Sequence, residues 1–195
     1  FDARAKPQSV SGDRLPGVAM NEAVLVREAP LAHLRWGGGD RLVVLLHGLG
    51  GGRAAWGDAL SGTGPALAAA GLAAVAVDLP GYGDSPTIDP FDIAGMAAAV
   101  VALIDALQPR RCALVGHSMG GMVAQEVVAR RPDLVSRLVL CGTSPSFGKP
   151  DGDWQQAFVA QRTAPLDAGQ TMAEMAGQLV PRMVGPGSLP EGVRL

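Results

Sequence analysis

The segment Gly116-His117-Ser118-Met119-Gly120 combines a nucleophile with the glycines that a very tight turn requires. It follows the apolar run at residues 112–115 and precedes a helical pattern that ends before Pro132. In a G-x-S-x-G pattern between a strand and a helix, the serine sits on a strained backbone at the carboxyl end of the strand. Larger side chains in place of the glycines would collide with the adjoining strand or helix. We therefore predict Ser118 to be a catalytic nucleophile in acyl transfer.

A glycine-rich turn, His47 to Gly52, directly follows an apolar run that ends at Leu46. Backbone N–H groups in such a turn can point at a reaction centre and hold a developing negative charge. We predict an oxyanion hole made by the amides of Leu49 and Met119, with Gly50 as the alternative to Leu49. A phosphate-binding loop would need a following Gly-Lys-Ser/Thr or a G-x-G-x-x-G fingerprint, and neither is present. No cofactor and no metal are expected.

Unalternated apolar runs alternate with helical stretches and predict strands buried on both faces of a parallel sheet, with helices on each side. These runs are residues 42–46, 72–77, 112–115 and 137–141. Two antiparallel edge strands are expected before them, at residues 22–28 and 31–36. The predicted fold class is therefore α/β, with a mostly parallel, doubly wound sheet.

Helix signals lie between and after these runs. Asp89-Pro90 predicts the start of a helix, with Asp89 as the cap, and Pro109 predicts its end. Its apolar stripe is expected to face the core and comprises Ile93, Met96, Val100, Leu103, Ile104 and Leu107. Further helices are predicted at residues 154–161 and 172–180. Thr171 and Glu174 form a capping-box pattern at the start of the second, and Pro181 predicts its end.

Three motifs occur in order: His47-Gly48, Asp78-Leu-Pro-Gly-Tyr-Gly-Asp-Ser85, and the serine segment with Gly121 after it. With them, the chain resembles the α/β-hydrolase superfamily from about residue 22 to its end, in the esterase, enol-lactonase and cofactor-free perhydrolase branch. The resemblance implies the α/β-hydrolase fold with a helical cap and with the last strands missing. It also implies that Gly81 and Gly83 make the middle turn and that Asp84 bonds nearby backbone. A serine nucleophile excludes the haloalkane dehalogenases and epoxide hydrolases, which use an aspartate.

The expected domains are a leader or non-native disordered extension at residues 1–19, the α/β-hydrolase core at 20–146, and a partial helical cap at 147–195. Met20 stands before the first strand-like run and is the expected natural start. The cap carries apolar residues at helical spacings, and packing onto the core is their favoured role: Trp154, Phe158, Met172, Met175 and Leu179. A cap of this kind suggests a small, mostly apolar acyl substrate.

A serine nucleophile needs a histidine base and a carboxylate that orients it, and the superfamily order is Ser, then Asp or Glu, then His. The chain has three histidines, and none follows Ser118. His117 should point away from the serine hydroxyl, His47 should hold the oxyanion turn, and His33 is expected to be a partly exposed residue of an edge strand.

The carboxylates after Ser118 offer no convincing triad acid, because those of the cap do not follow a seventh strand: Asp151, Asp153, Asp167 and Glu174. We therefore expect a truncated chain that lacks roughly 60 to 100 residues of a complete domain. Reading the coding frame past Leu195 would test this expectation.

The predicted function is hydrolysis of a carboxylic ester or lactone through a serine acyl-enzyme. The catalytic activity of this fragment itself is expected to be weak or absent. Thioesterase, amidase or C–C bond hydrolase activity is the alternative within the class. A non-catalytic binding protein on the same scaffold is the alternative outside it. The substrate-binding residues stay open.

Composition excludes several partners. With 16 basic and 18 acidic residues mixed along the chain, no basic patch for nucleic acid or a membrane surface is expected. Charged residues interrupt each apolar run before the ~18 residues of a membrane span. Cys112 and Cys141 are expected at opposite ends of neighbouring strands, too far apart for a disulfide. Two buried, reduced thiols and no signal peptide favour the cytoplasm.

Overall fold

Six strands form one mixed sheet within residues 24–26, 30–57, 62–149 and 152–183, the residues that this computed structural model describes. The strands are β1 (Val24–Val26), β2 (His33–Trp36), β3 (Arg41–Leu46), β4 (Ala73–Val77), β5 (Arg111–His117) and β6 (Val135–Cys141). Their order across the sheet is β1-β2-β4-β3-β5-β6. β3 is parallel to β4 and β5, and β5 is parallel to β6, whereas β2 is antiparallel to β1 and β4. The predicted α/β class with a mostly parallel sheet is confirmed.

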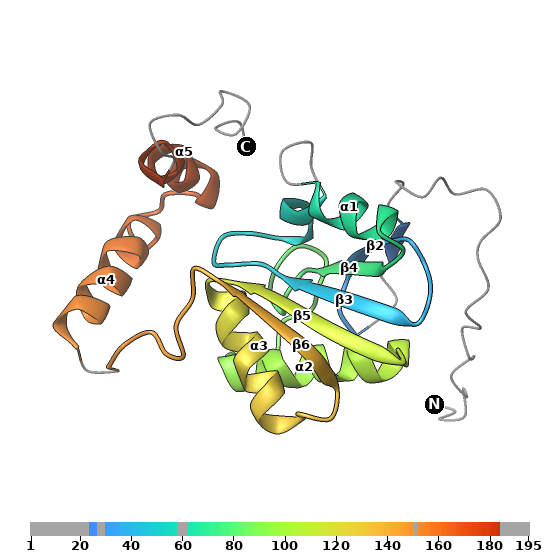
Figure 1. Ribbon diagram of the computed structural model, residues 1–195. Coiled ribbons are helices and arrows are strands. Elements are labelled where there is room, and N and C mark those ends of the chain that lie inside the picture. Colours follow the sequence, from blue (N-terminus) through green and yellow to red (C-terminus); the bar gives the residue numbers. More distant parts are fainter. Residues whose placement is uncertain (1–23, 27–29, 58–61, 150–151, 184–195) are drawn as a thin grey trace, which may run out of the picture. The chain divides into compact units, whose positions relative to one another are not determined.

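Helices cover both faces of this sheet (Figure 1). The helices α2 (Ile93–Leu107) and α3 (Met119–Arg130) lie on one face, and α1 (Thr63–Ala69) lies on the other. A short 3-10 helix, η1 (Arg53–Trp56), follows the glycine-rich turn. Since each face of the central strands is covered, β3 and β4 are buried almost throughout.

Two hydrophobic cores result, one on each face. Leu42, Val44 and Leu46 of β3 pack with α2 and α3, whereas Val43 and Leu45 pack with the residues on the other face. This alternation along one strand follows from the pleat of the backbone. The predicted stripe of α2 is confirmed, because its members are either buried in the first core or packed against it.

The start of α2 differs from the prediction. Asp92, not Asp89, caps the helix, and its carboxylate accepts a hydrogen bond from the Gly95 N–H at 2.7 Å. Both aspartates match a cap by type, but only Asp92 stands directly before the first helical residue, Ile93.

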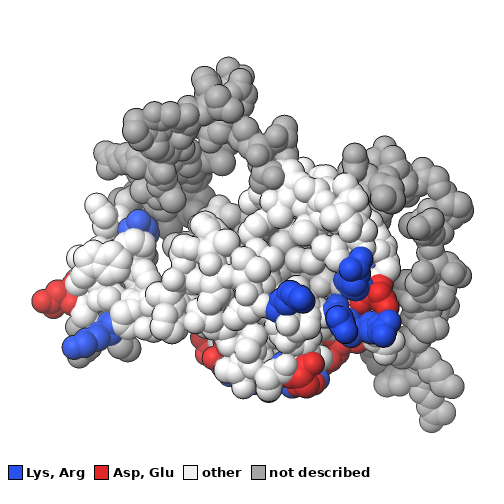
Figure 2. Space-filling model, in the orientation of Figure 1, with Lys and Arg blue, Asp and Glu red and all other residues white. Residues whose placement is uncertain are grey.

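Two strand predictions are also corrected. β2 is not an edge strand, because β1 and β4 pair with its two sides, and His33 is therefore buried rather than partly exposed. β6 pairs with β5 on one side only among the described strands, and its Val139 and Leu140 are 48% and 43% exposed. It is thus not buried on both faces, and Cys141 at its end is an exposed thiol rather than a buried one. Figure 2, drawn in the same orientation as Figure 1, shows that most of the described surface seen in that view is uncharged.

The chain divides into two units, residues 1–145 and residues 146–195, which we call the core unit and the C-terminal unit. The C-terminal unit holds α4 (Asp153–Asp167) and α5 (Met172–Met183). The predicted capping box is confirmed: the Glu174 N–H donates to Thr171 Oγ1 at 3.2 Å, and the Thr171 N–H donates to the Glu174 carboxylate at 2.8 Å. The predicted end at Pro181 is wrong, because the helix extends two residues beyond it.

The expected leader at residues 1–19 and the expected start at Met20 lie outside the described residues. Within the described ranges, no helix combines the length and the hydropathy that a membrane span needs.

Replacing Asp92 with alanine is expected to lower the free energy of unfolding by about 1 kcal/mol, because α2 loses its N-terminal cap. Urea denaturation of the variant and the unmodified protein measures this difference. Asp89→Ala is the matched control and should change the free energy by less than about 0.5 kcal/mol. A larger effect from Asp89 than from Asp92 would contradict the observed cap.

Candidate active site

Ser118 lies on a strained turn between β5 and α3. Its backbone has φ 51° and ψ −118°, a left-handed φ that few residues other than glycine adopt. Two hydrogen bonds hold the turn: the Ser118 N–H donates to the Cys141 carbonyl at 2.9 Å, and Thr143 Oγ1 donates to the Ser118 carbonyl at 2.7 Å. The strand, sharp turn and helix therefore occur where the serine motif predicts them.

Close packing requires the flanking glycines. A Cβ on Gly120 would overlap the carbonyl oxygens of Leu46 and His47, and one on Gly116 would overlap the backbone of Gly120 and Gly121. These obstacles are backbone atoms, which have no alternative rotamer. The end of β3 and the first turn of α3 are therefore in direct contact only because these positions carry no side chain.

The glycine-rich turn, residues 47–52, lies against this serine, and we call it the oxyanion loop. The Gly51 N–H donates to the Gly48 carbonyl at 3.0 Å, and Gly50 has φ 74°, as in a type II turn with Leu49 and Gly50 at its centre. A Cβ on Gly48 would lie only 3.0 Å from the Ser118 Cβ. Gly48 is therefore the point at which the loop meets Ser118.

Neither predicted donor, the Leu49 N–H or the Met119 N–H, has a hydrogen-bond partner among the residues that the structure describes. Gly50, the alternative donor, differs, because its backbone amide is close enough to the Tyr82 hydroxyl to lower the pKa of that group. The same hydroxyl lies 4.0 Å from the Met119 sulfur. Burial raises the pKa of Tyr82, and the Gly50 amide partly opposes that rise. The geometry therefore favours Leu49 over Gly50 as the loop's free donor.

His47 uses both ring nitrogens to hold the loop. Its Nε2 accepts the Leu79 N–H at 3.1 Å, so Nδ1 carries the proton and donates to the Gly48 carbonyl at 2.8 Å. The ring also packs edge-on against Tyr82, with centroids 4.8 Å apart. Burial is the main cause that lowers its pKa, with the Gly48 bond and the Asp78 charge acting against it. His47 is therefore a neutral structural residue, as expected from its position.

The other two histidines are not arranged as the base. His33 is buried and its Nδ1 bonds the Leu31 carbonyl at 2.9 Å. His117 is exposed, and its Nδ1 would lie 2.9 Å from a Cβ on Gly48, so the ring stands beside the loop. No histidine or carboxylate side chain within the described ranges hydrogen-bonds the Ser118 hydroxyl.

The carboxylates of the predicted cap belong to the C-terminal unit, apart from Asp151, which lies outside the described residues. Glu174 serves there as the cap of α5. In the described part of the chain, no three His, Cys, Asp or Glu side chains are grouped so that they could hold a metal ion.

Two of the predicted cap residues, Trp154 and Phe158, form a partly exposed aromatic cluster with Phe147 within the C-terminal unit. The ring of Phe147 lies 5.5 Å from that of Trp154 and 4.9 Å from that of Phe158, and the Arg162 guanidinium stacks on Phe158. Trp154 nevertheless remains 60% exposed. Met172 is 61% exposed, and the Leu179 side chain lies outside the described set.

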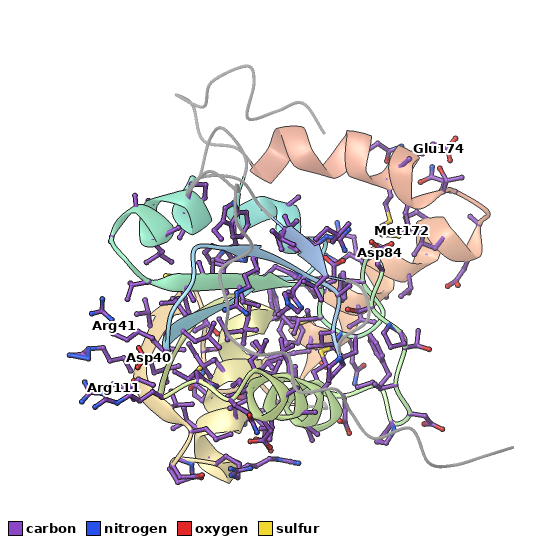
Figure 3. The ribbon with its side chains drawn as sticks, turned by 90° about the vertical axis from the view of Figure 1, so that its right-hand side faces the viewer. Asp40, Arg41, Asp84, Arg111, Met172 and Glu174 are labelled. Atoms are coloured by element: carbon purple, nitrogen blue, oxygen red, sulfur yellow. The ribbon has the colours of Figure 1, made fainter. Side chains whose placement is uncertain are left out.

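One charged cluster near the loop was not predicted. Arg53, the first residue after the loop, pairs with Asp78 and with Asp84. The Asp78 carboxylate also accepts the Arg53 N–H at 2.8 Å and the Asp84 N–H at 3.1 Å. Since β3 and β4 are parallel neighbours, an arginine after one and an aspartate after the other are placed to meet. Figure 3 shows Asp84 on the side of the core unit opposite Asp40, Arg41 and Arg111.

Comparisons with known proteins agree with this architecture. A family model described as "alpha/beta hydrolase fold" matches residues 41–182. The pimeloyl-acyl-carrier-protein methyl ester esterase of Neisseria meningitidis is 39% identical over 120 residues, which cover 60% of this chain and 42% of that protein. An esterase of Mycobacterium tuberculosis is 33% identical over 162 residues, which cover 80% of this chain and 48% of that protein. The chain thus spans less than half the length of these curated relatives.

A solved structure, a hydrolase from Pseudomonas aeruginosa, superposes with a TM-score of 0.68 at 26% sequence identity. The match covers 87% of this chain and 63% of that chain.

Stability is expected to fall between pH 7.5 and pH 5.5 because burial lowers the pKa of both His33 and His47. As the pH falls through about 6.5, the unfolded chain binds protons that the folded chain excludes, so the free energy of unfolding decreases. Each histidine contributes at most about 1.4 kcal/mol per pH unit below that value. Urea denaturation at several pH values measures the slope, and a constant or rising stability toward pH 5.5 would contradict the neutral, buried state of these rings.

Proposed function

Because the chain belongs to the alpha/beta hydrolase fold family, we propose that the protein containing it hydrolyses a carboxylic ester or lactone through an acyl-enzyme on Ser118. The observation that carries this proposal is the strained backbone of Ser118 at the end of β5, with Gly48 of the oxyanion loop packed against it. A left-handed φ at a serine is costly, and such strain is concentrated at functional sites.

In the proposed reaction, Ser118 Oγ attacks the carbonyl carbon of the substrate and loses its proton to a base. The carbonyl oxygen becomes an oxyanion and accepts hydrogen bonds from the N–H groups of Leu49 and Met119. Collapse of this intermediate passes the proton from the base to the leaving oxygen, expels the alcohol and leaves the acyl group on Ser118. Water then loses a proton to the base and attacks the acyl carbon, and the acid is released as Ser118 Oγ takes that proton back. In a lactone, the expelled alcohol stays attached to the acyl group.

The first turn of α3 supports the same reaction. Met119 begins the helix, where the amides lack intrahelical partners and the helix dipole is positive. A negative charge that forms beside Ser118 is stabilised there, in addition to its two direct hydrogen bonds.

In this proposal the base lies in a part of the protein outside the described residues. His47 bonds with both ring nitrogens, His33 is buried against a carbonyl, and His117 stands beside the loop. The two esterases described above share sequence with this chain, and the first acts on a methyl ester by its name. Their names support an ester as the substrate class.

Replacing Ser118 with alanine is expected to reduce ester hydrolysis by at least about 1000-fold, because the covalent step is lost. The assay uses protein from the coding frame extended past Leu195, with p-nitrophenyl esters, lactones and thioesters as a panel. Ser144→Ala, at an exposed serine after β6, is the control and should keep full activity. Activity that survives in Ser118→Ala would refute the nucleophile, and a protein with no activity on the whole panel would favour the binding-protein alternative.

Replacing Leu49 with proline is expected to lower kcat by about 100-fold, because proline has no N–H to donate to the oxyanion. Proline is favoured at the second position of a type II turn, so the loop should keep its shape. KM should change little, since the lost bond forms in the transition state. Leu49→Ala keeps the amide and is the matched control. Equal activity in both variants would show that Leu49 is not a donor.

A further inference from the structure

We propose that Arg53 is a positioning residue for the oxyanion loop, which it ties to Asp78 and Asp84 so that the Leu49 N–H is held where the oxyanion forms. This inference rests on the proposed function and extends it beyond the residues that touch the substrate.

Arg53 makes contacts with both its backbone and its side chain. Its N–H donates to Asp78 Oδ1 at 2.8 Å, and its Nη1 pairs with Asp78 Oδ2. Its Nη2 donates to Asp84 Oδ2 at 2.7 Å. The Asp84 N–H returns to Asp78 Oδ2 at 3.1 Å, which closes the network. One arginine therefore links the end of the loop to two carboxylates on one turn.

Burial makes the Arg53–Asp78 ion pair strong and sensitive to substitution. The Asp78 side chain is 3% exposed and that of Arg53 is 19% exposed, whereas that of Asp84 is 40% exposed. A carboxylate buried to this extent needs a cation and hydrogen bonds to offset its lost hydration. Arginine suits this place because its planar guanidinium can meet two carboxylates at once. The buried Arg53–Asp78 contact holds the loop, and the more exposed Arg53–Asp84 contact orients the guanidinium.

The loop is held against the segment of residues 78–85 at both ends. At its start, His47 Nε2 accepts the Leu79 N–H. At its end, Arg53 pairs with Asp78. Leu49 lies between these contacts and is 61% exposed, so packing of its own side chain does little to fix its position. The position of its N–H therefore depends on the contacts on either side.

This dependence predicts a specific kinetic signature. A shift of a few tenths of an ångström in a donor weakens the hydrogen bond to the oxyanion, which exists only in the transition state. Binding of the uncharged substrate should be less affected. A residue that only stabilised the fold would instead change the amount of active protein and leave kcat per active molecule unchanged.

The test uses the protein in which Ser118-dependent ester hydrolysis is measured, with the variants Arg53→Ala, Arg53→Lys and Asp84→Asn. Arg131→Ala is the matched control, because Arg131 also pairs with two aspartates, Asp105 and Asp133, at the end of α3. For Arg53→Ala we expect kcat per titrated serine to fall about 10- to 100-fold, with KM within about threefold. Arg53→Lys should recover part of the loss, and Arg131→Ala should match the unmodified protein.

A second measurement addresses the oxyanion directly. Phenylboronic acid forms a tetrahedral adduct with an active serine, and its inhibition constant should rise in Arg53→Ala by about the factor by which kcat/KM falls. Unchanged kcat and unchanged boronate inhibition in Arg53→Ala would overturn the proposal.

Asp84→Asn keeps the buried Arg53–Asp78 pair, so this variant tests the positioning role of Arg53 if Arg53→Ala does not fold. The amides of its oxyanion loop, residues 47–52, should exchange hydrogen for deuterium faster than those of Arg131→Ala, and kcat should fall a few-fold. Equal exchange and equal kcat would overturn the proposal. Activity retained in Ser118→Ala would instead refute the proposed function, while the exchange measurement on the 195-residue chain would still test whether Arg53 holds the loop.

Discussion

The register of β3 between β4 and β5 determines where every group of the candidate site lies. Leu46 at the end of β3 pairs with Gly116 of β5, and Leu45 pairs with Ala76 of β4. The carboxyl ends of these three parallel strands therefore lie side by side at one end of the sheet. The oxyanion loop, the serine turn and the segment of residues 78–85 follow directly, so strand pairing brings them together before the contacts of His47 and Arg53 hold the loop in detail.

The segment of residues 78–85 connects the carboxyl end of β4 to the antiparallel half of the sheet. Ser85 Oγ accepts the Ala32 N–H at 2.9 Å and donates to the Asp78 carbonyl at 2.7 Å. Gly81 and Gly83 have φ of 79° and 51°, which agrees with the turn expected of them. The Asp78 carboxylate also bonds the backbone, because it accepts hydrogen bonds from the Arg53 and Asp84 amides. A charge buried at this point is thus compensated from the loop, the turn and the guanidinium together.

Sequence patterns predicted the sheet and the serine turn because both have strong local causes: long apolar runs, and glycines where only glycine fits. Burial was predicted less well, because it depends on neighbours that are distant in sequence. The same pattern that describes the buried β4 also describes the exposed β6, and His33 is buried only because β1 and β4 flank its strand. The ion pairs of Arg53 were missed for this reason: a single arginine after a loop has no distinguishing pattern until β3 and β4 are known to be adjacent. Neither the motifs nor the described geometry assigns a base to Ser118.

The difference between the two thiols makes one of them a natural attachment point for a reporter group. Burial raises the pKa of Cys112 to about 12, so almost none of it is thiolate at neutral pH and reagents have no access to it. Cys141 is exposed, and its carbonyl accepts the hydrogen bond of the Ser118 amide. A maleimide dye or nitroxide would therefore attach at Cys141 alone, beside Ser118, and would report changes around that serine without any engineered cysteine.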